Sequence, residues 1–321
     1  MRIARLCLVA AMASALVAPA VQAQTKTVAI TAIVEHPALD STREGVLAAL
    51  KEAGWTPGEN LEVEFQSAQG NPATAAQIAR QFVGKRPDVI VPIATPSAQA
   101  VVAATRDIPV VFSAVTDPVG AQLLKSMDKP GGNVTGLSDL APVADHLALI
   151  REVLPEARRI GVLYNPGETN SVALVALLKE QAAGQGLTVV EALATKSADV
   201  QQATRSLVGK ADAVYVPLDN TVVSALESVI AVGRQAKLPV FSADTDSVAR
   251  GTVASVGFNY FQIGKQTGAL VDRILKGEKP GDIPAVFAHG TDLHVNPQSA
   301  AAMGVTLSDA LIGRAVKVVG Q

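Results

Sequence analysis

Cysteine is almost absent from this chain, since the only one among its 321 residues is Cys7. It lies in a segment that we expect to be removed during export, so the mature chain carries no thiol. Cys7 also lacks the Leu-small-small context of a lipoprotein attachment site, which favours a protein free of a lipid anchor. Disulfides and thiolate-bound metals are thereby excluded from the mature protein.

The sequence also lacks an apolar run long enough to span a bilayer, which takes roughly 20 residues. The run at 6–17 is shorter, follows Arg2 and Arg5, and precedes the small-x-small pattern of residues 21–23. This order is typical of a cleavable signal peptide, here residues 1–23. We therefore predict a soluble protein that is secreted into the periplasm.

Positive charge is not in excess either. The formal net charge of −2 becomes −4 when Arg2 and Arg5 leave with the signal peptide. Proteins that bind nucleic acids carry basic patches. We expect no nucleic-acid partner.

Catalytic and metal-binding signatures are missing as well. The four histidines show no metal-ligand spacing such as His-x3-His. No Gly-x-Ser-x-Gly nucleophile elbow is present, and the glycine-rich segment 130–136 lacks the Lys-Ser/Thr of a phosphate loop. Glu35 and His36 offer an acid and a base, but without a paired nucleophile. We therefore predict no enzyme activity, no metal site and no cofactor.

What the chain does contain is an alternation of short β-branched runs and helical patterns, which indicates βαβ units and parallel sheets. The second half repeats the first: SAVTDPV at 113–119 returns as SADTDSV at 242–248, with five of seven residues identical. In the first half we expect strands at 27–34, 61–65, 88–91 and 109–112, with helices at 41–53, 73–83 and 97–105.

Two similar halves predict an α/β protein with two similar lobes, each a doubly wound parallel sheet flanked by helices. We place lobe 1 at residues 24–138 plus 258–285, and lobe 2 at residues 139–257 plus 286–321. Three crossing segments, at 136–142, 255–259 and 283–289, would form the hinge on which the lobes close. Ligands of parallel sheets bind beyond the carboxyl ends of the strands, so we expect a ligand cleft between the lobes.

The polar residues that follow the predicted strands suit a zwitterion. A carboxylate is favoured at helix N-termini beside Ser or Thr hydroxyls, and an ammonium group is favoured by acidic side chains such as Glu35, Asp117, Asp219 or Asp244. The candidate ligand-binding residues are Glu35, Asp40, Thr95, Ser97, Ser113, Asp117, Tyr164, Asn165, Asn170, Ser171, Asp219, Asn220, Asp244 and Tyr260. For each hydroxyl or acidic residue that precedes a helix, simple capping is an equal alternative.

Several segments together carry a resemblance to a known family. They are EHPALD at 35–40, ATP at 94–96, AQA at 98–100, PVVFSAVTDP at 109–118, GGNVTG at 131–136, GVLYNPGETNS at 161–171 and DNT at 219–221. On these segments the mature chain resembles, nearly end to end, the ABC transporter substrate-binding proteins related to the tryptophan/tyrosine-binding proteins of bacteria.

The resemblance implies a type I periplasmic binding-protein fold, a helix at 262–275 that returns to lobe 1, and an importer whose ABC permease and ATPase are separate chains. We predict a monomeric periplasmic receptor that delivers an amino-acid-like ligand, preferably aromatic or otherwise hydrophobic, to that permease. Two alternatives stay open: a receptor for a signalling system, and a binder of another solute such as a sugar or purine. Aromatic residues make up only 3% of the chain, which disfavours the stacking platforms of the second alternative.

Overall fold

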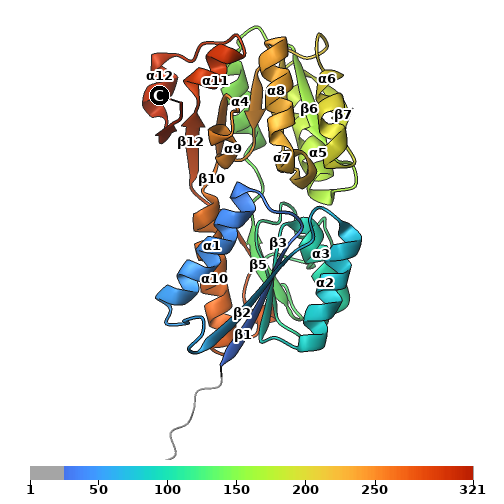
Figure 1. Ribbon diagram of the computed structural model, residues 1–321, viewed down its shortest axis with the longest axis vertical. Helices are drawn as coiled ribbons and strands as arrows, with labels where there is room; N and C mark the ends of the chain where they lie inside the picture. Colours follow the sequence, from blue (N-terminus) through green and yellow to red (C-terminus); the bar gives the residue numbers. More distant parts are fainter. Residues whose placement is uncertain (1–24, 321) are drawn as a thin grey trace, which may run out of the picture.

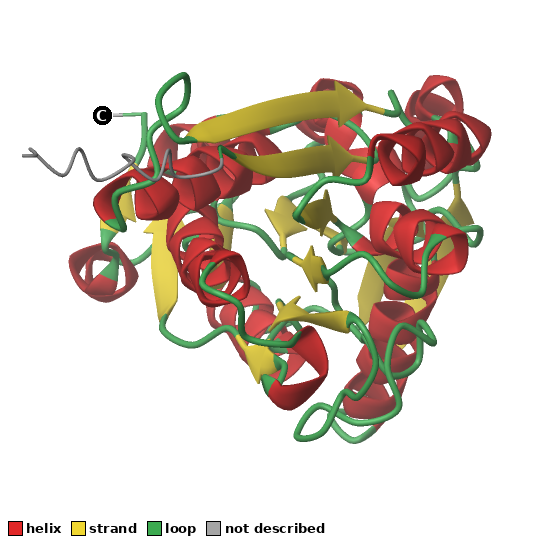
Figure 2. Cartoon of the chain, turned by 90° about the horizontal axis from the view of Figure 1, so that it is seen from below, coloured by secondary structure: helices red, strands yellow, loops and turns green. Residues whose placement is uncertain are grey.

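The computed structural model describes residues 25–320, which form two α/β lobes stacked along the long axis of the molecule (Figure 1). Seen from below, strands occupy the middle of the molecule and helices lie on either side of them (Figure 2). The signal peptide predicted at 1–23 falls outside the described residues and stays a prediction. Between residues 25 and 320, no helix has the length and apolar character needed to cross a membrane.

Lobe 1 is built on a six-stranded sheet of order β11-β5-β4-β3-β1-β2, in which all pairings are parallel. Helices α1 and α10 cover one face and α2 and α3 the other (Figure 1). Strand β3 is buried along its whole length because helices cover both faces. The strands are β1 (Lys26–Ala32), β2 (Leu61–Ser67), β3 (Val89–Ile93), β4 (Val110–Phe112), β5 (Val134–Ser138) and β11 (Val286–Phe287). The helices are α1 (Pro37–Glu52), α2 (Pro72–Lys85), α3 (Thr95–Ala104), α10 (Tyr260–Leu275) and the 3₁₀ turn η2 (Pro280–Asp282).

Lobe 2 repeats this topology in a four-stranded parallel sheet of order β7-β6-β8-β9. The order matches β2-β1-β3-β4 of lobe 1, so the sequence repeat is also a structural repeat. A three-stranded sheet, β10-β12-β13, adds an antiparallel pair between β10 and β12. The strands are β6 (Arg159–Tyr164), β7 (Thr188–Leu193), β8 (Ala213–Val216), β9 (Val240–Ser242), β10 (Ala254–Phe258), β12 (Thr291–Val295) and β13 (Lys317–Val318). The helices are α4 (Val143–Val153), α5 (Thr169–Ala183), η1 (Ser197–Asp199), α6 (Val200–Arg205), α7 (Asn220–Ser224), α8 (Leu226–Ala236), α9 (Asp246–Ala249), α11 (Pro297–Ala302) and α12 (Asp309–Arg314).

Each lobe has its own hydrophobic core. One cluster of buried side chains comes from residues 28–137 and 258–285, and the other from 141–254 and 295–311. The chain therefore passes between the lobes three times. Strand β11 pairs with β5 of lobe 1, which carries lobe 1 contacts slightly beyond residue 285.

The second crossing returns α10 to lobe 1, where it packs against α1. Gly45 of α1 lies against the backbone of α10, and Gly264 of α10 lies against the backbone of α1. A side chain at either position would collide with the facing helix, so the two glycines permit this close approach. The helix expected at 262–275 is thus confirmed, beginning two residues earlier. Helix α1 also begins earlier than expected, at Pro37, because proline suits the first helical position.

Candidate functional site

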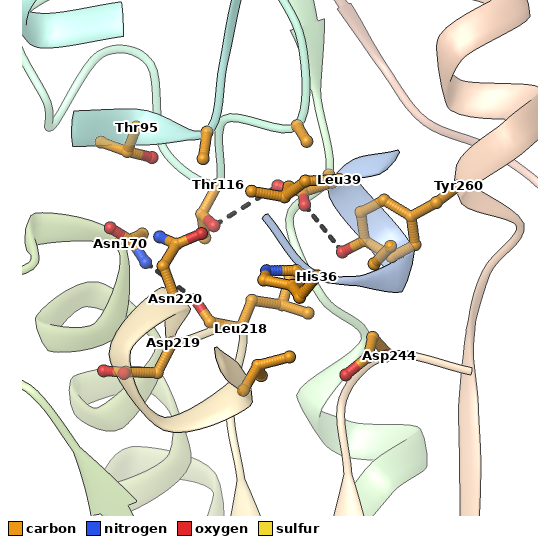
Figure 3. Close-up of a pocket in the computed structure, with 15 residues that line it drawn as sticks. His36, Leu39, Thr95, Thr116, Asn170, Leu218, Asp219, Asn220, Asp244 and Tyr260 are labelled. Carbon is orange, nitrogen blue, oxygen red and sulfur yellow. Dashed lines mark hydrogen bonds between the residues drawn. The ribbon is translucent and has the colours of Figure 1, made fainter. Parts of the chain in front are cut away.

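A cavity lies between the lobes, beyond the carboxyl ends of strands from both sheets (Figure 3). The space in it that protein atoms do not fill is about 360 Å³, part of which is open to solvent. Loops that follow β1, β3, β4 and β5 reach it from lobe 1, and loops that follow β6, β8 and β9 reach it from lobe 2. Its lining residues are His36, Ala38, Leu39, Ala94, Thr95, Ala114, Thr116, Asp139, Asn170, Leu218, Asp219, Asn220, Val223, Asp244 and Tyr260.

The lobe 1 wall presents two helix N-termini to the cavity. His36 is the N-cap residue of α1, and Thr95 is the first residue of α3. Both side chains are buried, and neither His36 Nδ1 nor Thr95 Oγ1 has a hydrogen-bond partner among the described residues. Buried polar atoms are rarely left unpaired, and the ends of these helices attract negative charge. This wall is therefore suited to an anionic group.

Ser97, in the first turn of α3, extends the same pattern. Its side chain is fully buried, and Oγ has no partner within residues 25–320. Ala94, which precedes the helix, adopts φ 72°, a backbone conformation that is costly for a residue other than glycine. The local strain and the unpaired hydroxyls coincide at one end of α3.

The lobe 2 wall is organised by two buried carboxylates at the start of α7. Asp219 Oδ1 accepts a hydrogen bond from Val222 N (2.8 Å), and Oδ2 accepts from Asn165 N (2.6 Å) and Ser171 Oγ (2.6 Å). Asp219 therefore fixes α7, α5 and the loop after β6 to one another.

Glu168 is the second of these carboxylates. Its oxygens accept hydrogen bonds from Asn220 N (3.0 Å), Asn220 Nδ2 (2.6 Å), Thr221 N (2.9 Å) and Thr221 Oγ1 (2.7 Å). It is buried behind Asn220 and does not itself line the cavity. Asp244 of the next loop plays a similar part, because Oδ1 accepts from Ser247 N (2.8 Å) and Oδ2 from Ser247 Oγ (2.6 Å).

The segments that cross between the lobes contribute a third group. Asp139 follows β5 and Tyr260 begins α10, so each stands beside a crossing. Tyr260 Oη donates to Asp139 Oδ2 (2.9 Å), and Thr116 Oγ1 lies 3.4 Å from Asp139 Oδ1 (Figure 3). All three side chains are buried and line the cavity.

The charged side chains that line the cavity are acidic, and the nearest influence of opposite sign is Arg250 behind the wall, which acts to lower the pKa of Asp244. No lysine or arginine from the described part of the chain is among its lining residues. Burial raises the pKa of Asp139 to about 6 and raises the pKa of Asp244. Burial, followed by the neighbouring Glu168 carboxylate, also raises the pKa of Asp219. Burial lowers the pKa of His36 to about 3, so this imidazole is neutral at pH 7.

Six of the candidate residues from the sequence line the cavity. They are Thr95, Asn170, Asp219, Asn220, Asp244 and Tyr260. Ser97 and Ser171 lie directly behind that wall. Asn165 links the loop after β6 to α7, since Nδ2 donates to Thr221 Oγ1 (2.9 Å). Which of these residues contact a ligand stays a prediction.

The other five candidates lie away from the cavity lining. Glu35 is exposed, and Asp40 forms an ion pair with Arg43 (3.6 Å). Ser113 Oγ bonds to Thr267 Oγ1 (2.7 Å) in the lobe 1 core, and Asp117 Oδ1 accepts from Gly120 N (2.8 Å). Tyr164 Oη donates to Glu191 Oε2 (2.7 Å) on the β6–β7 surface. Apart from Glu35, each of these groups has a structural use that its position after a strand did not reveal.

The sequence-based selection omitted His36, Thr116, Asp139 and Glu168. The first two stand in segments that the sequence had marked as strand ends. Glu168 also stands in such a segment, 164–171, but was not selected from it, and it precedes a helix without capping it through its side chain. Asp139 had no such signal, because it lies in a crossing. The apolar part of the lining, including Leu39, Leu218 and Val223, was indistinguishable from core in the sequence.

The family model described as ABC transporter substrate binding protein matches residues 27–319. The chain belongs to this family. A tyrosine-binding protein of Clostridioides difficile (strain R20291) is 41% identical over 278 residues, covering 87% of this chain and 81% of that protein.

Two solved structures are similar over nearly the whole chain. A conserved domain protein of Vibrio cholerae is 55% identical with a TM-score of 0.91, covering 92% of this chain and 100% of that one. An ABC domain from Streptococcus pneumonia in complex with L-Trp is 33% identical with a TM-score of 0.89, with the same two coverages. The two-lobed fold is that of type I periplasmic binding proteins, which distant solute-binding proteins at 15 to 16% identity share.

The arrangement of the lobes can be judged against a further structure. The ligand-free, open form of a substrate binding protein with adhesive properties from Clostridium difficile is 41% identical, over 92% of this chain and 100% of that one, with a TM-score of only 0.70. The L-Trp complex is less similar in sequence but more similar in structure.

Proposed function

We propose that this protein captures an aromatic amino acid, tyrosine or tryptophan, between its lobes and delivers it to the permease of an ABC importer. One observation carries the proposal: a cavity between the lobes with unpaired polar atoms at helix N-termini on one wall and three acidic side chains elsewhere in its lining. A zwitterion carries the complementary charges, a carboxylate for the helix N-termini and an ammonium group for the acids. Leu39, Leu218 and Val223 offer apolar surface to a side chain.

The names of two relatives support the choice of ligand. One is called a tyrosine-binding protein, and the other is an ABC domain in complex with L-Trp. Three polar atoms of the lining lack partners among residues 25–320: Thr95 Oγ1, His36 Nδ1 and Asn170 Oδ1. Asn170 Oδ1 can only accept a hydrogen bond, whereas the Thr95 hydroxyl and the His36 ring can donate one to a carboxylate. We place the ligand carboxylate there.

Delivery of the ligand to the permease depends on closure of the lobes around it. The lobes are linked by three crossings and meet across the cavity, so a bound ligand favours the closed arrangement by the difference between its affinities for the two states. Thr169 Oγ1 of α5 donates to Gln99 Oε1 of α3 (3.2 Å), a contact that forms only when the lobes meet. An exported receptor of this kind would present its closed form to an inner-membrane permease, and the ligand would leave unchanged rather than as a product.

The test uses the mature chain from Gln24, unfolded and refolded to remove any carried ligand. Its thermal unfolding is measured with each of the twenty amino acids, several sugars and several nucleosides. A ligand at 100 times its Kd adds about 2.7 kcal/mol of stability, which raises the Tm by several degrees. Shifts confined to tyrosine, tryptophan or phenylalanine support the proposal, and a shift with sugars or nucleosides alone overturns it.

A further inference from the structure

The acidic side chains around the cavity differ in how completely their hydrogen-bonding capacity is used. Asp219 accepts three hydrogen bonds from lobe 2, and Asp244 accepts two from Ser247. Both therefore hold helix ends together. Asp139 has one short partner, the hydroxyl of Tyr260 at 2.9 Å, and one long contact with Thr116 at 3.4 Å. A carboxylate has about four acceptor positions. Asp139 and Asp244 each accept two hydrogen bonds, but one of the two at Asp139 is long, so Asp139 is the most weakly satisfied of these acids.

The position of Asp139 is also unlike that of the other acids. It lies in the first crossing, where its backbone N donates to Val115 O of lobe 1 (3.3 Å), and Tyr260 lies at the end of the second crossing. Its side chain is 3% exposed and lines the cavity. Isolated buried charges are costly unless they are paired, and no basic side chain of the described residues lines the cavity with it.

We propose, building on the proposed function, that Asp139 is the partner of the ligand ammonium group and that Tyr260 is a positioning residue for it. A cation placed beside Asp139 supplies the charge that its surroundings lack. The hydroxyl of Tyr260 holds Oδ2, so that Oδ1, whose one partner is the long contact with Thr116, remains for the ligand. Since both residues stand beside crossings, the ammonium group is bound at the hinge.

The other titratable groups that face the cavity are His36, Asp219, Asp244 and Tyr260. His36 is neutral at pH 7, so it does not compete with the ligand for Asp139. Because burial raises the pKa of Asp139 to about 6, binding of an ammonium group must displace a proton below that pH. Affinity for an amino acid is therefore expected to fall as the pH drops below about 6.

The experiment compares each amino acid with its analogue that lacks the amino group. Isothermal titration gives the Kd of L-tyrosine and 3-(4-hydroxyphenyl)propanoate, and of L-tryptophan and indole-3-propanoate, for the wild type, Asp139→Asn and Tyr260→Phe. Asp145→Asn is the matched control, since Asp145 is an exposed acid a few residues further along. In Asp139→Asn, the amino acids should bind about 30-fold more weakly or worse, as expected for loss of one partner of a buried charge pair.

The analogues should respond in the opposite direction, because Asp139→Asn removes a negative charge that repels them. Tyr260→Phe should weaken amino-acid binding by a smaller factor and leave analogue binding nearly unchanged. If Asp139→Asn does not fold, the assignment of Asp139 is tested instead by Tyr260→Phe and by the pH dependence of wild-type affinity between pH 5 and 8. A role confined to folding would weaken both ligand types equally.

Two results would overturn the assignment. In the first, Asp139→Asn binds amino acids as the wild type does. In the second, amino acids and analogues lose affinity in parallel and wild-type affinity for L-tyrosine does not change across pH 6. Failure of the wild type to bind either amino acid is a separate result, because it removes the proposed function itself.

Discussion

The lobe 1 wall of the cleft presents polar atoms without partners, whereas the lobe 2 wall presents carboxylates that already accept several hydrogen bonds. Thr95 Oγ1, Ser97 Oγ and His36 Nδ1 have no partner in the described chain. Asp219 and Glu168, by contrast, are bound by backbone and side-chain donors of lobe 2. Lobe 1 thus offers more unpaired polar atoms to an outside partner, whereas in lobe 2 Asn170 Oδ1 is the lining atom without a partner in the described chain.

The two copies of the repeated segment, 113–119 and 242–248, also show a difference between the lobes, here at single residues. Thr116 and Thr245 occupy equivalent places in the two copies, and each hydroxyl reaches a crossing: Thr116 approaches Asp139, and Thr245 Oγ1 donates to Phe258 O (3.1 Å). One place earlier the copies diverge, with Val115 in lobe 1 and Asp244 in lobe 2. The two copies therefore share a contact between this threonine and a crossing, and they differ in the residue that precedes the threonine.

The largest expected effect tests whether the lobe 2 acids are structural. Asp219→Ala leaves three buried donors without an acceptor, so the free energy of unfolding should fall by about 3 kcal/mol or more. Urea denaturation measures the loss. Asn71→Ala is the matched variant, because Asn71 caps α2 at an exposed site of lobe 1, and should cost about 1 kcal/mol. Equal losses in the two variants would contradict a structural role peculiar to lobe 2.

A pH titration of stability tests the crossing between the walls. Burial raises the pKa of Asp139 from 3.8 to about 6, so between these values the folded chain holds a proton that the unfolded chain has lost. Stability from this group therefore falls as pH rises through that window, by about 3 kcal/mol in total. Ligand-free Asp139→Asn should be more stable than the wild type at pH 8 and equal to it near pH 3.5. Parallel curves for the two proteins would show that Asp139 is not the buried acid described here, and Asp145→Asn should follow the wild type.

The lobe 1 donors are tested by Thr95→Val, which keeps the shape of the side chain and removes the hydroxyl. Because a hydrogen bond to a charged group is lost, tyrosine or tryptophan should bind about 10-fold more weakly. Stability of the ligand-free protein should not fall, since the hydroxyl has no partner to lose. Thr267→Val provides the contrast: its hydroxyl bonds to Ser113 Oγ and Ile263 O in the core, so it should lower stability and leave affinity intact. A loss of stability in Thr95→Val would mean that its hydroxyl is used within the lobe.

The smallest effect concerns the contact between the lobes. Thr169→Ala removes the exposed hydrogen bond to Gln99, and exposed polar contacts contribute little. Affinity should fall less than about threefold, chiefly through faster dissociation. Stopped-flow dissociation measures this change. A larger loss of affinity would indicate that closure depends on this exposed contact more than on the residues that line the cavity.

Much of the fold was predictable because it depends on local patterns. The alternation of β-branched runs and helical periods located β1 to β4, and the repeat at 113–119 and 242–248 indicated two lobes. The antiparallel pairing of β10 with β12 was not predictable, because the sequence of a strand does not indicate which other strand it pairs with. Helix α10 returned to lobe 1 as the resemblance implied.

The candidate site was predictable as a set of loops and not as a set of side chains. Ser113 and Asp117 follow a strand just as Thr116 does, yet only Thr116 lines the cavity. Whether such a side chain lines the cavity depends on its orientation and on its hydrogen-bond partners. The partner of Ser113, for example, is Thr267 of α10, far along the chain. Asp139 was overlooked because its neighbours Thr116 and Tyr260 come from distant segments.

By itself, the sequence determined the α/β class, the two-lobed organisation, the family and the strand ends that surround the cleft, because these follow from composition, periodicity and local motifs. Only the tertiary structure decided which acids are already committed to helix ends and which retain capacity for a ligand. That distinction depends on the number and the distances of hydrogen-bond partners in a buried space, and partners such as Asp139 and Tyr260, 121 residues apart in the chain, meet only when the fold brings two of the crossings side by side.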